Sequence, residues 1–219
     1  MTRWYDDACG TAHALELVGE RWSLLVIREL MFGPRRFSDL RRALPGISAT
    51  VLTQRLEGLE AAGVLARRTL PPPAGVQVYG LTPWGYEAEP AIQALGRWAA
   101  RSPGHDPTLP LSAASAMLSL RTMFAGEAAG GKTLTVGFRF GAEEYRAAVE
   151  DGRFRVGRGE AAGADLLMEG APEGVAALVY GGAPADELAR AGLLRVEGDA
   201  GDLARFTGLF RLPPKAGAG

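Results

Sequence analysis

The stretch ISATVLTQRLEGLEAAGVLARRTLPPPAGVQVYGLTPWG, residues 47–85, decides the fold of the first half of this chain. Ser48 is a helix-capping residue type, and Gly63 stands where a helix can end in a left-handed turn. Between them three leucines share one face at helical spacing: Leu52, Leu56 and Leu59. Two short strand-like runs around a proline-rich loop follow. A capped helix followed by such a wing predicts a winged helix-turn-helix.

The other face of the same predicted helix is polar. Thr50, Thr53 and Gln54 lie there, and their hydroxyl and amide groups suit the edges of bases in a major groove. We expect these three residues to read DNA sequence. Further DNA-binding candidates lie at the two helix starts and in the second wing strand: Ser38, Ser48 and Gln77.

The upstream segment predicts the supporting helices. Apolar residues recur at helical spacing from Ala14 to Met31, which indicates one helix, although Gly19 weakens its middle. Gly33-Pro34 ends that helix. A short second helix is expected from Phe37 to Leu44, and Pro45-Gly46 then turns the chain into the capped helix.

The charge pattern favours a nucleic-acid interface on one face. Residues 35–68 carry seven arginines against Asp39, Glu57 and Glu60, a local balance of 7 − 3 = +4, whereas the whole chain has a formal net charge of −1. For each arginine the alternative is a solvated surface charge, and for Arg55 an ion pair with Glu57 or Asp39 is equally open. All seven arginines are DNA-binding candidates: Arg35, Arg36, Arg41, Arg42, Arg55, Arg67 and Arg68. Those at positions 35, 36, 41 and 42 flank the second helix, and we assign them to phosphate positioning.

Six ordered blocks carry a resemblance to a known family: Cys9, GERWSLLVIREL, GPRRFSDLRRALPGIS, LTQRLEGLEAAGVLARR, VYGLTPWG and LGRWA. Together they resemble the HxlR family of bacterial transcription regulators over about the first hundred residues. The resemblance implies a cytoplasmic homodimer that binds a pseudo-palindromic operator in double-stranded DNA and represses or activates transcription. One departure lies in the wing, where family members often carry a basic residue and this chain has Val76, Gln77 and Val78.

Cys9 is the single cysteine, so no internal disulfide can form. The resemblance implies that a cysteine at this place can sense oxidants or electrophiles, because a thiolate near a dimer interface can form an intersubunit disulfide or an adduct. Asp6 and Asp7 should oppose thiolate formation, which favours a structural thiol. Cys9 is therefore a redox candidate with both roles open.

Two segments are candidates for the dimer interface. Thr82-Pro83 can start another helix, and Pro90 should kink or split it. Beyond that proline, Leu95, Trp98 and Ala99 form an apolar stripe without an obvious partner in so small a domain. We expect this stripe and residues 4–14 to meet a second copy of the chain. Packing against a second domain is the alternative.

The chain is long enough for two domains. It has 219 residues, 47% hydrophobic and 22% charged, which is ordinary globular composition. The segment RSPGHDPTLP, residues 101–110, marks the boundary. We predict a DNA-binding and dimerisation domain over 1–102, a linker over 103–110, a second domain over 111–212 and a flexible tail over 213–219. Neither a membrane span nor a signal peptide is indicated.

The second half alternates between strand and helix patterns. Residues 1–102 carry 12 basic and 10 acidic side chains and the rest carry 12 and 15, so nucleic acid is not its expected ligand. Its predicted elements form an α+β domain, an antiparallel sheet covered by helices on one side. They are helix 111–124, strand 133–140, a hairpin of 144–149 and 154–157, strand 164–169, helix 172–180, strand 194–197 and helix 200–210.

Five blocks, TVGFRF, EDGRFRVGRG, ADLLMEG, VAALVYGGAP and LLRVEGDAGDLARFTGLF, resemble the sterol-carrier-protein-type lipid-binding domain over residues 109–212. The resemblance implies an apolar cavity for a lipid or another hydrophobic small molecule, which would act as an effector. The alternative is that these side chains fill a core. The candidates for the cavity lining are Phe138, Phe140, Tyr145, Met168, Leu178 and Phe206.

No sequence signal predicts an enzyme. GEAAGGKT, residues 126–133, matches the phosphate-loop pattern, but a helix precedes it and a strand follows, the reverse of a nucleotide-binding loop. His13 and His105 lack metal-ligand spacing. We therefore expect no catalytic residues, metal or cofactor. The competing function is a lipid- or small-molecule-binding protein whose N-terminal domain serves mainly for dimerisation.

Overall fold

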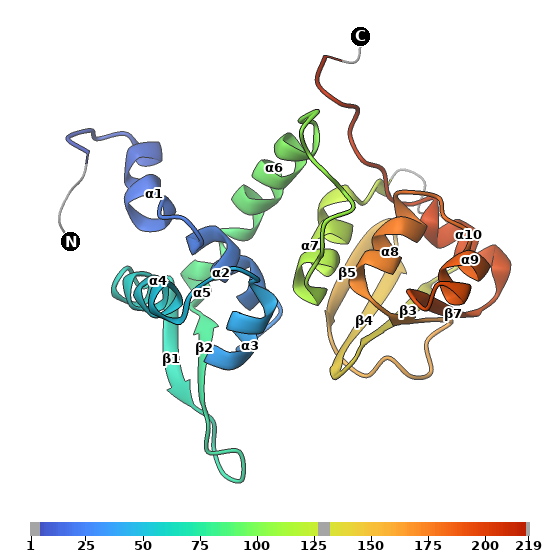
Figure 1. Cartoon of the computed structure of the whole chain (residues 1–219), viewed down its shortest axis with the longest axis horizontal. Coiled ribbons are helices and arrows are strands. Elements are labelled where there is room, and N and C mark those ends of the chain that lie inside the picture. The colour runs from blue at the N-terminus through green and yellow to red at the C-terminus, as the bar shows by residue number, and fades with distance from the viewer. Residues whose placement is uncertain (1–4, 127–131, 218–219) are drawn as a thin grey trace. The chain divides into compact units, whose positions relative to one another are not determined.

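The computed structural model describes residues 5–126 and 132–217. The chain divides into two compact units, residues 1–92 and 93–219, and the border falls inside helix α6, Glu89–Ala100 (Figure 1). Trp4 and most of the phosphate-loop-like segment 126–133 lie outside the described residues. Among the described residues, no helix combines the length and apolar character needed to cross a bilayer.

The N-terminal unit is a winged helix-turn-helix. Strands β1 and β2 pair antiparallel, with Leu65 opposite Leu81 and Thr69 opposite Gln77. The loop between them is the wing tip, and the predicted arrangement of two short strands around a proline-rich loop is confirmed. The elements are α1 (Gly10–Val18), α2 (Ser23–Leu30), α3 (Phe37–Ala43), α4 (Ala49–Ala61), β1 (Leu65–Thr69), β2 (Gln77–Leu81) and α5 (Pro83–Tyr86).

The prediction of one helix from Ala14 to Met31 is wrong. The chain leaves α1 after Val18 and enters α2 at Ser23. At Gly19 a Cβ atom would lie 2.3 Å from the carbonyl oxygen of Leu15, so only glycine fits. Trp22 then adopts a left-handed conformation, with φ of 81°, just before α2. This tight reversal separates the two helices.

The predicted ends of α4 are confirmed. The Ser48 hydroxyl accepts a hydrogen bond from the Val51 N–H at 3.2 Å. Gly63 has φ of +75°, the left-handed conformation expected after the helix. Thr82 caps α5 and also donates to the Gly63 carbonyl at 2.8 Å, which ties the end of α4 to the helix after the wing. The expected split near Pro90 appears as the break between α5 and α6.

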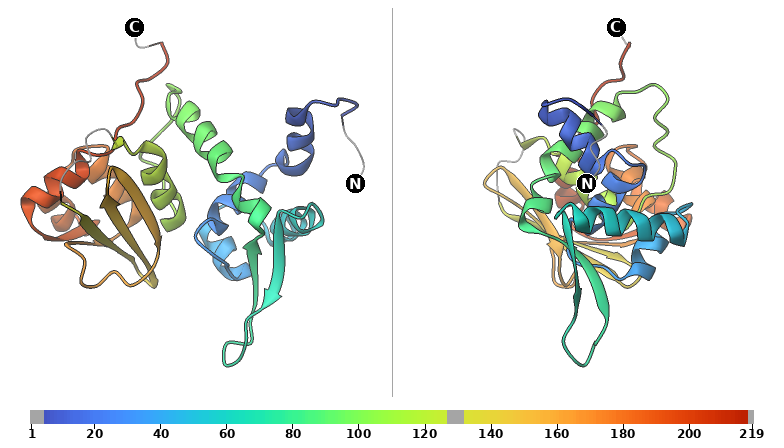
Figure 2. Two further views of the ribbon diagram at one scale, coloured as in Figure 1. Left: turned by 180° about the vertical axis from the view of Figure 1, so that it is seen from behind. Right: turned by 90° about the vertical axis from the view of Figure 1, so that its left-hand side faces the viewer.

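The C-terminal unit is one mixed sheet with helices on one face (Figures 1 and 2). The strand order is β5-β4-β3-β6-β7. Three of its pairings are antiparallel as predicted, but β3 and β6 pair in parallel, so the sheet is not purely antiparallel. Its elements are α7 (Ala113–Met123), β3 (Leu134–Phe140), β4 (Glu143–Glu150), β5 (Arg153–Arg158), β6 (Leu166–Gly170), α8 (Pro172–Val179), α9 (Ala185–Arg190), β7 (Leu194–Gly198) and α10 (Ala200–Thr207).

The two faces of this sheet differ. Along β3 the residues Leu134, Val136, Phe138 and Phe140 are buried toward the helices, as their alternation predicts. On the other face Gly137 lies against the loop that leads to β6, since a Cβ there would be 2.1 Å from the Ala161 carbonyl oxygen. Helix α9 was not predicted, because it is a single short element with only Leu188 buried.

Candidate nucleic-acid interface

Helix α4 presents a polar face to solvent. Thr50, Thr53 and Gln54 are exposed, whereas Leu52, Leu56 and Leu59 on the opposite face are buried. Thr50 and Gln54 are four residues apart and Thr53 lies between them, so the three side chains cover adjacent turns of one face. In the described part of the chain, no side-chain hydrogen bond or ion pair engages any of them. The hydroxyl and amide groups of this face are therefore available to a ligand.

Arg55 is committed to an ion pair within the N-terminal unit. Its Nη1 lies 2.8 Å from a carboxylate oxygen of Glu20, just after α1. The partner is therefore neither Glu57 nor Asp39. The Arg55 side chain is only 19% exposed and is therefore poorly placed to reach a phosphate. Its ion pair instead connects α4 to the segment between α1 and α2.

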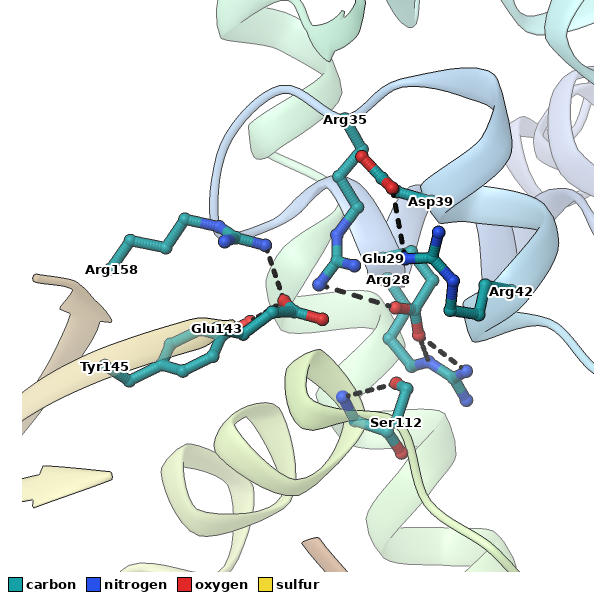
Figure 3. A network of polar contacts seen from close by, with 10 residues as sticks. Arg28, Glu29, Arg35, Asp39, Arg42, Ser112, Glu143, Tyr145 and Arg158 are labelled. Carbon is teal, nitrogen blue, oxygen red and sulfur yellow. Dashed lines mark hydrogen bonds and ion pairs between the residues drawn. The ribbon is translucent and has the colours of Figure 1, made fainter. Parts of the chain in front are cut away.

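Arg35 is buried, with 5% of its surface exposed. Its backbone pairs with Tyr79 of β2 through two hydrogen bonds, of 2.9 and 2.8 Å. Its guanidinium lies 3.9 Å from the buried carboxylate of Glu29, which also accepts hydrogen bonds from Arg28 (Figure 3). Through these contacts with Tyr79 and Glu29, Arg35 joins α2 to the wing.

Two further arginines form surface ion pairs. Arg42 lies 3.3 Å from Asp39 (Figure 3), and Arg67 lies 3.2 Å from Glu60. The Arg67 backbone N–H also donates to Glu60. Exposed pairs of this kind contribute little to stability, so an arriving phosphate can replace the carboxylate at small cost.

Three of the seven arginines have exposed side chains that make no hydrogen bond or ion pair with other described residues: Arg36, Arg41 and Arg68. The Arg68 guanidinium lies against Gly80 of the paired strand, because a Cβ added at Gly80 would be 2.8 Å from Arg68 Nη2. It therefore lies along the wing. These three side chains are the strongest candidates for phosphate contacts.

The polar candidates near the wing and the helix starts have different surroundings. Gln77 is exposed and donates to the Tyr79 hydroxyl at 3.2 Å. Ser38 is exposed in the first turn of α3, while the Ser48 hydroxyl accepts its capping bond. Both hydroxyls can therefore donate a hydrogen bond to a phosphate.

Cys9 is exposed immediately before α1, at the N-terminal end of that helix. Hydrogen bonds from the Thr11 backbone and side chain, and from the Ala12 backbone, lower the pKa of the Cys9 thiol. The Cys9 N–H donates to the Asp7 carboxylate at 2.9 Å. The lowered pKa opposes the expectation that Asp6 and Asp7 disfavour the thiolate, because the N–H groups at the start of α1 lie next to the Cys9 sulfur.

The six cavity candidates of the C-terminal unit lie together inside it and are all buried. Phe138 lies 6.1 Å from Phe140 and 6.2 Å from Phe206 between ring centroids. These spacings are typical of packed aromatic rings. The sequence did not indicate a polar pair between α7 and the end of α8, where the hydroxyls of Ser119 and Tyr180 share a hydrogen bond of 2.9 Å. Burial raises the pKa of Tyr180 to about 12.

The predicted dimer segments expose apolar side chains. Tyr5, inside the predicted segment 4–14, is 45% exposed, and no residue of α1 is buried, including Leu15 just beyond that segment. On α6, Trp98 is 74% exposed and Leu95 is 47% exposed. In the N-terminal unit a hollow of about 280 Å³ is lined by Leu17 and Val18 of α1 and by Trp84 of α5, among others. Apolar surfaces of this kind favour a protein partner.

Comparison with known proteins supports the N-terminal assignment. Residues 17–106 match the family model described as HxlR-like helix-turn-helix. An uncharacterized HTH-type transcriptional regulator from Synechocystis is 40% identical over 87 residues, which cover 40% of this chain and 64% of that relative, slightly less than two thirds of its length.

Two further relatives are covered more fully. The uncharacterized HTH-type transcriptional regulator YtfH from Escherichia coli is 36% identical over 94 residues, 43% of this chain and 75% of YtfH. The HTH-type transcriptional regulator YodB from Bacillus subtilis is 36% identical over 86 residues, 39% of this chain and 77% of YodB. The family model ends at residue 106, before the sheet of the C-terminal unit. This chain belongs to the HxlR family of helix-turn-helix transcription regulators.

Proposed function

We propose that this chain is a cytoplasmic DNA-binding transcription regulator that acts as a homodimer on a pseudo-palindromic operator. The observation that carries the proposal is the exposed polar face of α4, held by a buried apolar face on its other side. In this arrangement α4 enters the major groove, and Thr50, Thr53 and Gln54 contact base edges.

The arginines differ in whether their side chains are available to phosphates. Arg36, Arg41 and Arg68 bind the DNA backbone directly, since other described residues do not engage them. Arg42 and Arg67 exchange their surface carboxylates for phosphates, and Ser38 and Gln77 add polar contacts. Arg35 and Arg55 do not contact phosphates in this arrangement, because both are held in ion pairs and are largely covered. Each neutralised phosphate increases the salt dependence of binding.

The dimer joins two copies through α1 and the apolar stripe of α6. The exposed Leu15, Leu95 and Trp98 support this assignment. In a two-fold dimer the two α4 helices would enter major grooves about 34–36 Å apart, one turn of the duplex. A dimer whose α4 helices cannot reach that spacing would not bind such an operator.

The C-terminal domain, residues 111–212 after a linker at 103–110, is proposed to be a sterol-carrier-like effector domain. In support, its strands form one sheet with helices on one face, and all six candidates are buried, with the ring of Phe206 in α10 lying 6.2 Å from that of Phe138 in β3. A hydrophobic ligand held there would act by favouring one spacing of the two α4 helices.

Cys9 is proposed as a redox-sensitive site. The exposure of the thiol and the hydrogen bonds that lower its pKa support reaction of the thiolate with an oxidant. Two thiols of a dimer then form one disulfide and give up two protons and two electrons to a peroxide. Hydrogen peroxide is thereby reduced to two waters, and an organic hydroperoxide to an alcohol and one water.

Gel shift against the DNA upstream of the gene, across a salt series, tests the proposal. We expect specific retardation that weakens steeply as salt rises. Equal retardation of unrelated duplexes, or none, would contradict it. Native mass spectrometry of the same preparation reports the number of subunits and any hydrophobic molecule that copurifies; a ligand-loaded dimer without operator binding would favour the lipid-binding alternative.

A further inference from the structure

The C-terminal segment ends on α6. Lys215 Nζ donates hydrogen bonds to the carbonyl oxygens of Ala100 at 3.1 Å, Ser102 at 3.0 Å and His105 at 3.3 Å. The segment runs beside the end of α6 in both views of Figure 2. An ammonium group has three donors, and here they meet the last carbonyl of α6 and two carbonyls of the turn that follows it.

Backbone contacts reinforce this ammonium contact. The Ala216 N–H donates to the Arg101 carbonyl at 2.7 Å, and Arg101 Nε donates to the Pro214 carbonyl at 3.2 Å. The two segments therefore hold each other in both directions. Residues 214–216, part of the tail that the sequence predicts to be flexible, have defined partners.

The other end of this segment is fixed in the C-terminal unit. Phe210 is buried, and its ring lies 4.9 Å from the ring of Phe206 in α10. The Arg211 N–H then donates to the Met123 carbonyl at the end of α7 at 3.0 Å. A short run of chain thus connects the packed interior of the unit to the end of α6.

A second cationic side chain, Arg97, joins α6 to α7. The Arg97 guanidinium of α6 donates to the Thr122 carbonyl in the last turn of α7. Cations are favoured at helix C-termini, because the carbonyl groups there carry partial negative charge. Arg97 and Lys215 together fix the last turn of α6. The exposed Trp98 lies in that turn, between Arg97 and Ala100, the residue that Lys215 contacts.

We propose that residues 213–216 are a strap that locks the end of α6 to the C-terminal unit, so that the two move as one body. This inference rests on the proposed function, in which α6 is a dimer helix. The strap is then the route by which the state of the C-terminal unit reaches the dimer interface and the spacing of the α4 helices. When the strap is released, both units stay folded, but the state of the C-terminal unit no longer affects the dimer interface.

The composition of the chain allows a direct test, because Lys132 and Lys215 are its two lysines. Amine acylation followed by peptide mass spectrometry compares them in the intact wild-type protein. Lys132 is exposed and serves as the reference. We expect Lys215 to acylate about tenfold more slowly, since charge-assisted hydrogen bonds must open first. Equal rates at the two lysines would overturn the strap.

Hydrogen exchange of a Lys215→Met variant gives a second test. This change keeps a long side chain and removes all three donors. The amides of residues 101–105 should exchange about tenfold faster than in the wild type, while strands β3 and β4 stay unchanged. Lys132→Met is the matched control and should alter neither region. Unchanged exchange at 101–105 in Lys215→Met would overturn the proposal.

Neither readout depends on DNA, so the strap and the proposed function can fail separately. If the wild type binds its operator, Lys215→Met should bind about threefold more weakly than Lys132→Met, because a mobile α6 lowers the population of the competent spacing. Faster exchange with unchanged operator affinity would overturn the coupling. Protected Lys215 in a protein that binds no operator would support the strap and overturn the regulator.

Discussion

The polar face of α4 and the aromatic interior of the C-terminal unit are the two places where candidate functional side chains gather, and their surroundings differ. On α4, Thr50, Thr53 and Gln54 face solvent on a helix fixed by its other side. In the C-terminal unit, Phe138 and Phe206 are buried and pack against other rings. Substitution on α4 should therefore change binding and spare folding, whereas substitution in the interior should change folding first.

The largest effect is expected for Phe206→Ala. Phe206 is fully buried and contacts the rings of Phe138, Phe154 and Phe210. Loss of the ring should lower the free energy of unfolding of the C-terminal unit by about 3–5 kcal/mol. Urea denaturation followed by far-UV circular dichroism measures the change. A loss below about 1 kcal/mol would show a loosely packed interior and favour an open cavity at this site.

Gln54→Ala tests the other side of the comparison. The exposed amide supports no contact in the described structure, so stability should be unchanged. Discrimination between the operator and point-substituted operators should fall by about 1–3 kcal/mol at the bases that Gln54 reads.

Glu57→Ala on the same helix is the matched control for Gln54→Ala. Glu57 is exposed, and removal of its charge should strengthen binding to every duplex without changing the preference between them. Competition gel shifts with both variants give the two quantities. Equal loss of affinity on all duplexes for Gln54→Ala would contradict its role in reading bases.

Arg41→Ala should have a smaller and uniform effect. Arg41 is exposed on α3 and has no partner among the described residues. Its loss should weaken binding to all sequences about equally and reduce the slope of log affinity against log salt by about one. Arg190→Ala, an exposed arginine of the C-terminal unit, is the control and should leave the slope unchanged. A sequence-dependent loss in Arg41→Ala would place this side chain at a base edge.

The smallest effect concerns Cys9, which is exposed and held only by local hydrogen bonds. Because its pKa is lowered, the thiolate fraction at a given pH exceeds that of an ordinary cysteine, and alkylation should reach half its maximal rate at a lower pH. Thr11→Ala removes one of the hydrogen bonds that stabilise the thiolate and should shift the profile upward. Iodoacetamide kinetics across a pH series measure both curves, and coincident profiles would contradict the local account.

Local signals in the sequence predicted much of this structure, and the misses are non-local. The ends of α4 depend on Ser48 and Gly63, whose effects act within a few residues, and the alternation of β3 needs no distant partner. The break between α1 and α2 depends on close backbone packing at Gly19, and the parallel pairing of β3 with β6 joins segments far apart in the chain.

The candidate site shows the same division. Exposure of Thr50, Thr53 and Gln54 followed from helical periodicity and is confirmed. The partners of the arginines did not follow, because Arg55 pairs with Glu20 and Arg35 with Glu29, residues that no spacing rule connects. An arginine count gives the charge of a segment, but only the fold decides which of those charges remain available to a phosphate.

The most direct measurement is DNA cleavage by an iron chelate attached at residue 54. Gln54→Cys, in a chain that also carries Cys9→Ser, gives one attachment site on the exposed face of α4. We predict cleavage at two positions facing major grooves about 34–36 Å apart, related by the two-fold axis of the operator. No cleavage of an operator that the labelled protein still retards, or cleavage spread evenly along it, would contradict the placement of α4 in the major groove.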